Sequence, residues 1–190
     1  MILNRVYRRI FDAIAGVASL LRIVQLRLKY PGAGINFGCH ISRGCRISCT
    51  DDSQMMLHNV YIAQNAVLIA DDGGRLSISN SYVGFGAVIV AGQSIEIEDD
   101  CAIAEMVVIR DQDHRFGVGP GLRESGAEYS PVRIGRNVWI GSKATILRGV
   151  SIGDNSVVGA SSVVTKDIAT GSVAVGVPAK VVREIAAGRQ

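Results

Sequence analysis

Aromatic and charged residues are both scarce in this chain. Aromatics make up 5% of the 190 residues and charged residues 19%, whereas hydrophobic residues reach 48%. Such a chain must build its interior from aliphatic side chains, and it is long enough to bury one sizeable core. Only 4 prolines accompany 22 glycines, which favours many tight corners over a disordered chain. We therefore expect one folded domain with an aliphatic core.

The chain also lacks a strong excess of positive charge. Its formal net charge is +3, and no stripe of basic and aromatic residues follows the first 29 residues. Nucleic-acid-binding domains typically carry such a stripe. We expect no nucleic-acid partner.

The four cysteines form no CxxC pair and no cysteine–histidine cluster with zinc spacing. Cys39, Cys45 and Cys101 each follow an aliphatic residue by four places, where the C-terminal part of the chain has small residues. This pattern favours thiols that act as small apolar fillers over a disulfide or redox role. A reducing, cytoplasmic location is the expected consequence.

No long uncharged hydrophobic run occurs in the first segment, residues 1–32. Its longest such stretch, residues 13–21, is far shorter than the ~20 residues that span a bilayer. Asp12 interrupts the apolar pattern and no clear cleavage site follows, which argues against a signal peptide. Steps of three and four between apolar residues predict an amphipathic helix that packs on the domain or on a neighbouring subunit, or contacts an anionic membrane face. The apolar positions are Ile2, Val6, Ile10, Ile14, Val17, Leu21, Val24 and Leu28.

The dominant pattern is a repeat of six residues. In the stretch 132–164 an aliphatic residue stands at every sixth place, and shorter runs with the same period begin at Ile35. A period of six fits neither a helix nor a simple strand, and repeats of this kind decide the architecture. The positions in the stretch are Ile134, Ile140, Ile146, Ile152, Val158 and Val164.

A solenoid explains the repeat. Each hexad makes a short strand and a corner, the aliphatic residue points inward, and Gly, Asn or Asp at the corners tolerates a left-handed backbone. Three strands close a triangular coil of about 18 residues, and coils stack at about 4.8 Å. Roughly seven coils fit between Ile35 and Val175. An α-solenoid or a doubly wound sheet would need longer helical units than this sequence offers.

One segment, residues 111–131, interrupts the hexads and holds two of the four prolines. Loops that project from a rigid scaffold often carry function. We therefore divide the chain into a helix (1–32), a solenoid (33–175) with the insertion 111–131, and a C-terminal tail (176–190).

The stretches "NVWIG", "GDNSVVGASSVVTKDI" and "GVPAKVVREI", together with Asp113-His114 and "LRESGAEYSPVRIG", resemble the hexapeptide-repeat acyltransferases. The resemblance is greatest to the maltose and galactoside O-acetyltransferases and their polysaccharide O-acetyltransferase relatives. It implies a left-handed parallel β-helix, a homotrimer with sites between subunits, and acetyl-CoA as the acyl donor.

The implied reaction is acetyl transfer to a carbohydrate hydroxyl. A hydroxyl needs a base to remove its proton as it attacks a thioester, and histidine suits this role near neutral pH. His114 matches the catalytic histidine of the family. Asp111, Asp113 and Glu124 are candidates to orient the imidazole, and the sequence does not choose among them.

Other roles carry over from the family by motif. The backbone N–H of Ser142 would stabilise the oxyanion. Apart from the family motifs, Trp139 is the only tryptophan and stands at an outward hexad position, where we expect an exposed ring to cover the donor or acceptor cleft. The residues implied to contact coenzyme A are Ala160, Thr165, Lys166, Lys180 and Arg183.

The acceptor region departs from that of the sugar-acetylating relatives. Gly84 and Gly92 stand where those relatives have an Asn and an Asp that contact the acceptor. We interpret the two glycines as extra room for a bulkier acceptor, such as a surface polysaccharide or a lipid-linked glycan precursor.

The remaining histidines, His40 and His58, lie in the irregular early coils and are expected to be structural. The spacing of the three histidines lacks the pattern of the related carbonic anhydrases, so no metal is expected. Two other functions stay open. One is N-acetylation of a nucleotide-linked amino sugar, and the other is a non-catalytic β-helix scaffold.

Overall fold

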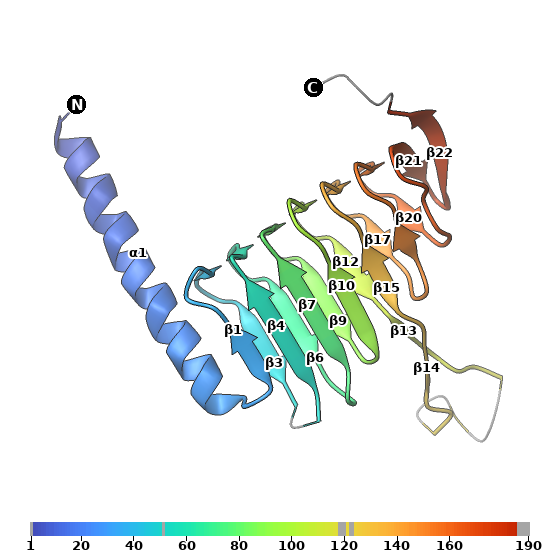
Figure 1. The fold of residues 1–190 in the computed structure, drawn as a ribbon, viewed down its shortest axis with the longest axis horizontal. Coiled ribbons are helices and arrows are strands. Elements are labelled where there is room, and N and C mark those ends of the chain that lie inside the picture. Colours follow the sequence, from blue (N-terminus) through green and yellow to red (C-terminus); the bar gives the residue numbers. More distant parts are fainter. Residues whose placement is uncertain (1, 51, 118–120, 122–123, 186–190) are drawn as a thin grey trace.

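The computed structural model describes residues 2–50, 52–117, 121 and 124–185, with side chains described from residue 13. The chain begins with one long helix, α1 (Ile2–Lys29), and continues as short strands that wind into a solenoid (Figure 1). The expected all-β solenoid, a parallel β-helix with an N-terminal helix and a projecting loop, is confirmed. No described helix has both the length and the apolar character needed to cross a membrane.

The solenoid has three parallel sheets, which we call sheets A, B and C. Sheet A contains β1 (Ala33–Ile35), β4 (Gln54–His58), β7 (Arg75–Ser79), β10 (Ser94–Ile97), β15 (Val132–Ile134) and β18 (Ser151–Ile152). Sheet B contains β2 (His40–Ile41), β5 (Tyr61–Ile62), β8 (Tyr82–Val83), β11 (Ala102–Ile103), β16 (Trp139–Ile140), β19 (Val157–Val158), β21 (Ser172–Gly176) and the antiparallel β22 (Ala179–Glu184). Sheet C contains β3 (Arg46–Cys49), β6 (Val67–Ala70), β9 (Val88–Ala91), β12 (Val108–Arg110), β17 (Thr145–Ile146) and β20 (Val163–Val164).

The core consists of stacked aliphatic side chains. Ile35 pairs with Leu57, Leu57 with Ile78 and Ile78 with Ile97, and Ile134 pairs with Ile152. All six of these residues are buried. The first three steps span 22, 21 and 19 residues, and the last spans 18. The early coils are therefore longer than the hexad rule predicts, and sheets A and C have six strands each, rather than the seven coils expected.

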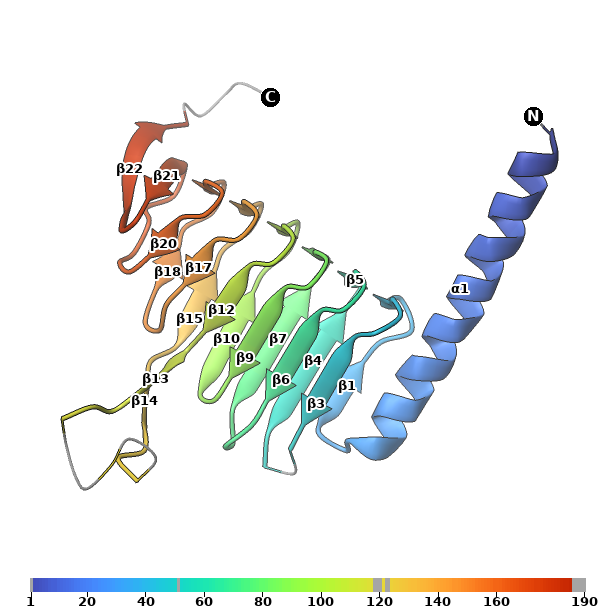
Figure 2. The same ribbon diagram turned by 180° about the vertical axis from the view of Figure 1, so that it is seen from behind.

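The helix α1 covers the open end of the first coil (Figures 1 and 2). The Ser19 hydroxyl accepts a hydrogen bond from the Ile41 N–H at 2.8 Å, and Arg22 Nη1 donates to the Ile41 carbonyl at 3.0 Å. Ile23 is fully buried against the core. Since an unpaired strand edge invites aggregation, α1 is an integral cap of the solenoid.

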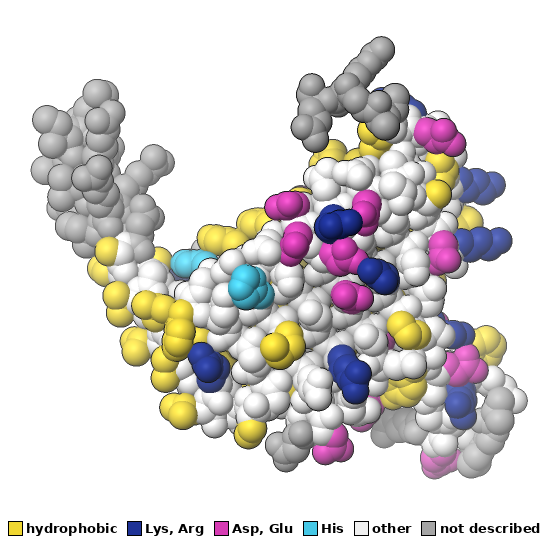
Figure 3. All heavy atoms as spheres, viewed as in Figure 1, with side chains coloured by type: hydrophobic (Ala, Val, Ile, Leu, Met, Phe, Trp, Pro, Cys, Tyr) yellow, Lys and Arg dark blue, Asp and Glu magenta, His cyan; other side chains and the backbone are white. Residues whose placement is uncertain are grey.

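The three outer faces differ in chemistry. Sheet A is polar, and its exposed Arg133 and Arg136 pair with Glu98 in the region of mixed charge visible in Figure 3. Sheet B carries a ladder in which the rings of His40 and Tyr61 stack at 4.7 Å and those of Tyr61 and Tyr82 at 5.5 Å. Sheet C presents mainly aliphatic side chains. Its outward positions include Val67, Ile69, Val88, Val108, Thr145 and Val163.

All four cysteines are free thiols, and three of them are buried. The Cys101 thiol donates to the Gly135 carbonyl at 3.0 Å in the next coil. Burial raises the pKa of each of the four thiols, so they are less reactive than exposed cysteines.

The segment predicted as a tail, residues 176–190, contains β22, which pairs with β21 as far as Glu184.

Candidate active site

The insertion forms a hairpin that projects from the corner between sheets C and A (Figure 1). It leaves the solenoid after β12 and returns at β15, and its strands β13 (Gln112–His114) and β14 (Ala127–Tyr129) pair antiparallel. His114 lies opposite Ala127 and is exposed. The imidazole makes no hydrogen bond to any part of the chain that the structure describes.

One arginine fastens this hairpin to the solenoid. Arg148 Nε donates to Asp113 at 2.9 Å, and Nη2 donates to Glu128 at 2.7 Å. Arg148 follows β17 at the C–A corner, one coil beyond the point where the hairpin leaves. Its guanidinium therefore joins both hairpin strands to the scaffold.

Strand alternation separates Asp113 from His114. Neighbouring residues of a strand point to opposite faces, and the Asp113 carboxylate lies on the face held by Arg148. His114 shares the other face with Gln112. Glu124 is exposed near the tip of the hairpin. In this chain the Asp113 carboxylate supports the hairpin and is directed away from the imidazole.

Asp111 anchors the base of the hairpin. Its side chain is buried, and its carboxylate accepts hydrogen bonds from the backbone N–H groups of Gly92, Gln93 and Ser94 at 2.6–2.8 Å. Its carbonyl also accepts the Ser130 N–H at 2.9 Å. The carboxylate thus supports the corner of the preceding coil.

The space above Gly92 is occupied within the chain. A Cβ atom at this position would collide with the Tyr129 ring and with Gln112 Oε1. A Cβ at Gly84 would collide with the backbone of Ala104 in the next coil. The interpretation of these glycines as room for an acceptor is therefore wrong within one chain, because protein atoms fill that space.

Tyr129 also links the hairpin to an acidic corner. Its hydroxyl donates to Asp72 Oδ2 at 3.0 Å, and this hydrogen bond raises the pKa of Tyr129. Next to Asp72, Asp71 Oδ1 is buried without a hydrogen-bond partner among the described residues. Burial, and then the charges of Asp72 and Asp111, raise the pKa of Asp71.

A second corner carries the predicted oxyanion donor. Ser142 and Ala160 occupy stacked corners between sheets B and C, and a Cβ at Gly141 would collide with the Ala160 backbone. Neither the Ser142 N–H nor the Ala160 N–H donates to a residue within the described ranges. These N–H groups remain available to donate hydrogen bonds to a ligand oxygen at a corner.

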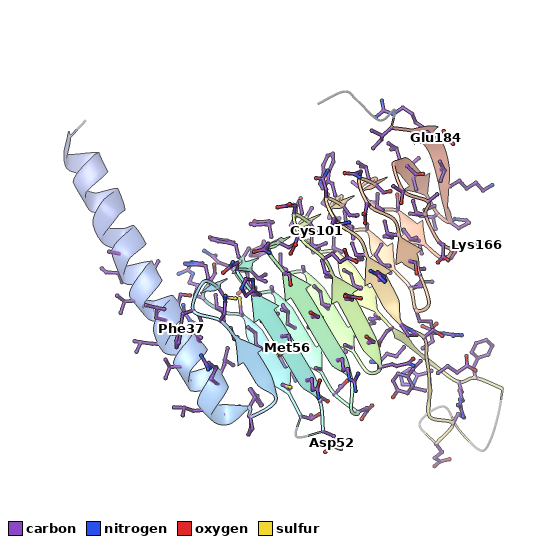
Figure 4. All side chains as sticks on the ribbon, viewed as in Figure 1. Phe37, Asp52, Met56, Cys101, Lys166 and Glu184 are labelled. Atoms are coloured by element: carbon purple, nitrogen blue, oxygen red, sulfur yellow. The ribbon has the colours of Figure 1, made fainter. Side chains whose placement is uncertain are left out.

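The other predicted contacts lie along the C-terminal half of the solenoid. Trp139 is 56% exposed on sheet B, beside Ala102 and Val157. Thr165 and Lys166 are exposed after β20, where Figure 4 shows Lys166 pointing away from the sheets. Lys180 and Arg183 are exposed on β22.

Within one chain, the two groups proposed for chemistry occupy different corners. Ser142 lies at the B–C corner, and the hairpin of His114 leaves from the C–A corner. The segment between these corners, from Ser142 to Arg148, has seven residues, and its six residue steps span up to about 20 Å when extended. Ser142 and the hairpin of His114 are therefore placed at opposite edges of sheet C.

The three histidines lie on three different sheets. His40 is on sheet B, His58 on sheet A and His114 on the hairpin. The part of the chain that the structure describes contains no group of three His, Cys, Asp or Glu side chains arranged to hold a metal ion.

The comparisons with known proteins agree with this geometry. A family model, the hexapeptide repeat of succinyl-transferase, matches residues 131–166. Galactoside O-acetyltransferase of Escherichia coli (strain K12) is 49% identical over 107 residues, which are 56% of this chain and 52% of the relative.

Two solved structures are similar over more of the chain. A maltose O-acetyltransferase from Clostridium difficile 630 is 30% identical, with 82% of this chain and 72% of that chain covered and a TM-score of 0.52. A galactoside acetyltransferase in complex with coenzyme A is 35% identical, with 75% and 66% covered and a TM-score of 0.54. The chain belongs to the hexapeptide-repeat acyltransferases. It spans about half the length of the curated relatives that it matches first.

Sequence reasoning missed the residues that hold the hairpin. Arg148 stands at an outward corner and Tyr129 at the end of the insertion, and neither has a local signal. A search for cations one coil away from an acidic insertion could have found Arg148. The partner of Tyr129, Asp72, is 57 residues away in sequence.

Proposed function

We propose that this protein is an acetyl-CoA-dependent O-acetyltransferase that acts on a carbohydrate hydroxyl, with His114 as the general base. The observation that carries the proposal is the exposed imidazole on a braced hairpin, combined with the unbonded Ser142 amide at a corner of the same scaffold. The similarity to galactoside and maltose O-acetyltransferases supports the reaction class.

The proposed residues divide the reaction between them. His114 takes the proton of the acceptor hydroxyl as its oxygen attacks the thioester carbonyl, and the Ser142 N–H donates to the oxyanion that forms. When the carbon–sulfur bond breaks, His114 returns the proton to the departing thiolate of coenzyme A. Lys166, Lys180 and Arg183 are exposed cations suited to the phosphates of the donor, and Thr165 and the Ala160 amide are suited to hydrogen bonds with it.

The active unit that we propose is a homotrimer. Sheet C is the aliphatic outer face, and a closed ring of three chains would bury it at the centre. Such a ring brings the B–C corner of one chain next to the C–A corner of the neighbour, because these two corners bound sheet C. His114 of one chain then meets Ser142 of the next, with Trp139 beside this junction.

The acceptor that we propose is a surface polysaccharide or a glycan precursor held at a membrane, with the enzyme on the cytoplasmic side. Because Gly84 and Gly92 open no space within a chain, the acceptor would lie between chains. Peripheral membrane contact through α1 is part of this proposal. It is supported by the apolar face that α1 leaves uncovered.

Release of coenzyme A thiol tests the proposal. The full chain is incubated with acetyl-CoA and a panel of monosaccharides, oligosaccharides, glycan chains and nucleotide-linked amino sugars. We expect acceptor-dependent release with glycan hydroxyls, and a loss of about two to four powers of ten in His114→Ala. His58→Ala, an exposed histidine on sheet A, is the matched control. Release only with amino sugars would assign N-acetylation, and no binding of coenzyme A would refute the enzyme.

A further inference from the structure

The helix α1 has two opposite faces over its described side chains. Ser19, Ile23 and Leu26 pack against the first coil. On the opposite side, an apolar stripe repeats at steps of three and four and is exposed among the described residues. The stripe consists of Ile14, Val17, Leu21, Val24 and Leu28, whose exposed fractions run from 43% to 81%.

Positive charge is concentrated at this end of the molecule. Residues 1–50 contain eight Lys or Arg and one acidic residue, a net charge of +7, whereas residues 51–190 carry a net charge of −4. Arg22 and Lys29 lie on one flank of the stripe and Arg27 on the other. No acidic residue occurs between residues 13 and 29.

A cavity of about 430 Å³ lies on the first flank, between α1 and β3. Arg22, Lys29 and Arg46 line it, and none of the described residues that line it is acidic. Tyr30 also lines this cavity. Its hydrogen bond with Ser48, together with Lys29 and Arg46, lowers the pKa of Tyr30. The flank of the helix is therefore electropositive beside an apolar stripe.

We propose that α1 lies in the headgroup region of an anionic phospholipid surface and holds the solenoid upright on it. An apolar stripe flanked by cations is the pattern of interfacial helices, in which basic side chains extend to the lipid phosphates. A second copy of the chain is a poorer occupant, because two such helices would place like charges side by side.

The orientation follows from the way α1 is attached. The helix crosses the end of the solenoid (Figures 1 and 2), and its free face points away from the coils. If a membrane lies against that face, the solenoid axis is directed away from the membrane surface. The strand β12, where the hairpin begins, is three coils above β3, which is roughly 14 Å at the usual strand spacing.

The height of the hairpin above the membrane restricts which acceptor hydroxyls can react, and this deduction rests on the proposed function. The helix adds about 10 Å of its own diameter, so His114 stands roughly 25 Å from the lipid surface. The hydroxyl that reacts must then belong to a sugar well removed from a lipid anchor. A sugar attached directly to the lipid phosphate would not reach the site.

Vesicle flotation of the full chain tests the docking. We expect binding to phosphatidylcholine vesicles that contain phosphatidylglycerol, weaker binding at high salt, and little binding to phosphatidylcholine alone. The double variant Val17→Gln with Leu21→Gln should bind at least about tenfold more weakly, whereas Met56→Gln, an exposed control on sheet A, should bind like the wild type. Equal binding by the double variant, or no binding at all, would overturn the proposal. So would a drop in sedimentation coefficient in the double variant, since that result would assign the stripe to a second copy.

Tryptophan quenching tests the upright orientation. Trp139, the only tryptophan, lies on β16, four coils above β2. Brominated lipids should leave its emission unchanged and should quench the emission of a Leu21→Trp variant in a Trp139→Phe background. Quenching of Trp139 would show that the solenoid lies on its side. Thiol release with a soluble acceptor, measured without vesicles on Val17→Gln with Leu21→Gln, should match the wild type. Absence of thiol release by the wild type with every acceptor tested, together with vesicle binding that the double variant weakens, would refute the proposed function alone.

Discussion

Asp113 and Glu128 lie directly opposite each other in the hairpin, and Arg148 binds both carboxylates. Like charges in facing positions of an antiparallel pair are destabilising. Because the Arg148 guanidinium pairs with both carboxylates, it offsets this repulsion and attaches the hairpin to the solenoid. The position of the strand that carries His114 therefore depends on Arg148.

Replacing Arg148 should reduce catalysis much more than stability. Exposed ion pairs contribute about 0–1 kcal/mol each, whereas a small misplacement of a catalytic group can cost up to about a hundredfold in rate. We expect Arg148→Gln to lower kcat about tenfold or more with little change in KM for acetyl-CoA, and Arg148→Lys to recover part of the loss. Steady-state kinetics beside thermal melts measure both quantities. Arg133→Gln, which removes an ion pair on sheet A, is the control, and an equal loss of kcat in it would contradict a specific role for Arg148.

Replacing Asp111 should reduce stability more than catalysis, in contrast to the replacement of Arg148. Its buried carboxylate accepts three backbone hydrogen bonds, and hydrogen bonds to charged groups contribute about 1.5–3 kcal/mol each. Asp111→Ala should lower the free energy of unfolding by about 3 kcal/mol or more in urea titrations. Asp113→Ala removes a carboxylate two residues away that is exposed, and it should cost about 1 kcal/mol or less. Similar costs for the two variants would be inconsistent with the anchoring role.

Asp71 should destabilise the protein at neutral pH. Burial, followed by repulsion from Asp72 and Asp111, raises its pKa, so the folded chain binds this proton more tightly than the unfolded chain. The loss in free energy of unfolding that the ionised carboxylate causes is complete above the raised pKa. It falls as the pH drops through that value and is gone below the usual pKa of 3.8. We expect Asp71→Asn to melt higher than the wild type at pH 7 and the difference to shrink on acidification. Asp52→Asn removes an exposed charge, and it should not reproduce this pH dependence.

A methyl group at Gly92 should displace the hairpin. The new Cβ would require Tyr129 and Gln112 to move, which would disturb the hydrogen bond to Asp72. We expect Gly92→Ala to reduce kcat at least about tenfold while coenzyme A binding is retained. Gly16→Ala, at a helical glycine with open space around it, should leave kcat unchanged. An active Gly92→Ala with a changed acceptor preference would instead restore the acceptor role for this glycine.

The repeat made the architecture predictable, because an inward aliphatic residue at each hexad can serve only a narrow stacked coil. Ile134, Ile140 and Ile146 lie on sheets A, B and C, as their spacing requires. The lengths of the early coils were not predictable, because residues are added between Ile35 and Ile97 without any change in the inward pattern. The number of coils was overestimated for this reason.

The sequence supplied candidate residues for the site but not their arrangement. His114 and Ser142 were chosen by motif and stay predictions, and their separation onto two corners depends on which corner carries the insertion. Asp111 and Asp113 are equivalent candidates in the sequence. Only the structure shows that the Asp111 carboxylate accepts hydrogen bonds from the solenoid backbone and that the Asp113 carboxylate pairs with Arg148. Gly92 resembled an opening because the sequence does not show that Tyr129 returns from 37 residues away to cover it.

Complementation between two inactive variants tests the central claim, that His114 and Ser142 act together from different chains. His114→Ala removes the base, and Ser142→Pro removes the backbone N–H, so each variant alone should be inactive. When the two are refolded together in equal amounts, random assembly should restore about one quarter of the wild-type thiol release, because that fraction of junctions combines an intact His114 with an intact Ser142 from the neighbour. If the mixture stays as inactive as its components while assembling normally, the two groups do not meet across a subunit junction and the account is wrong.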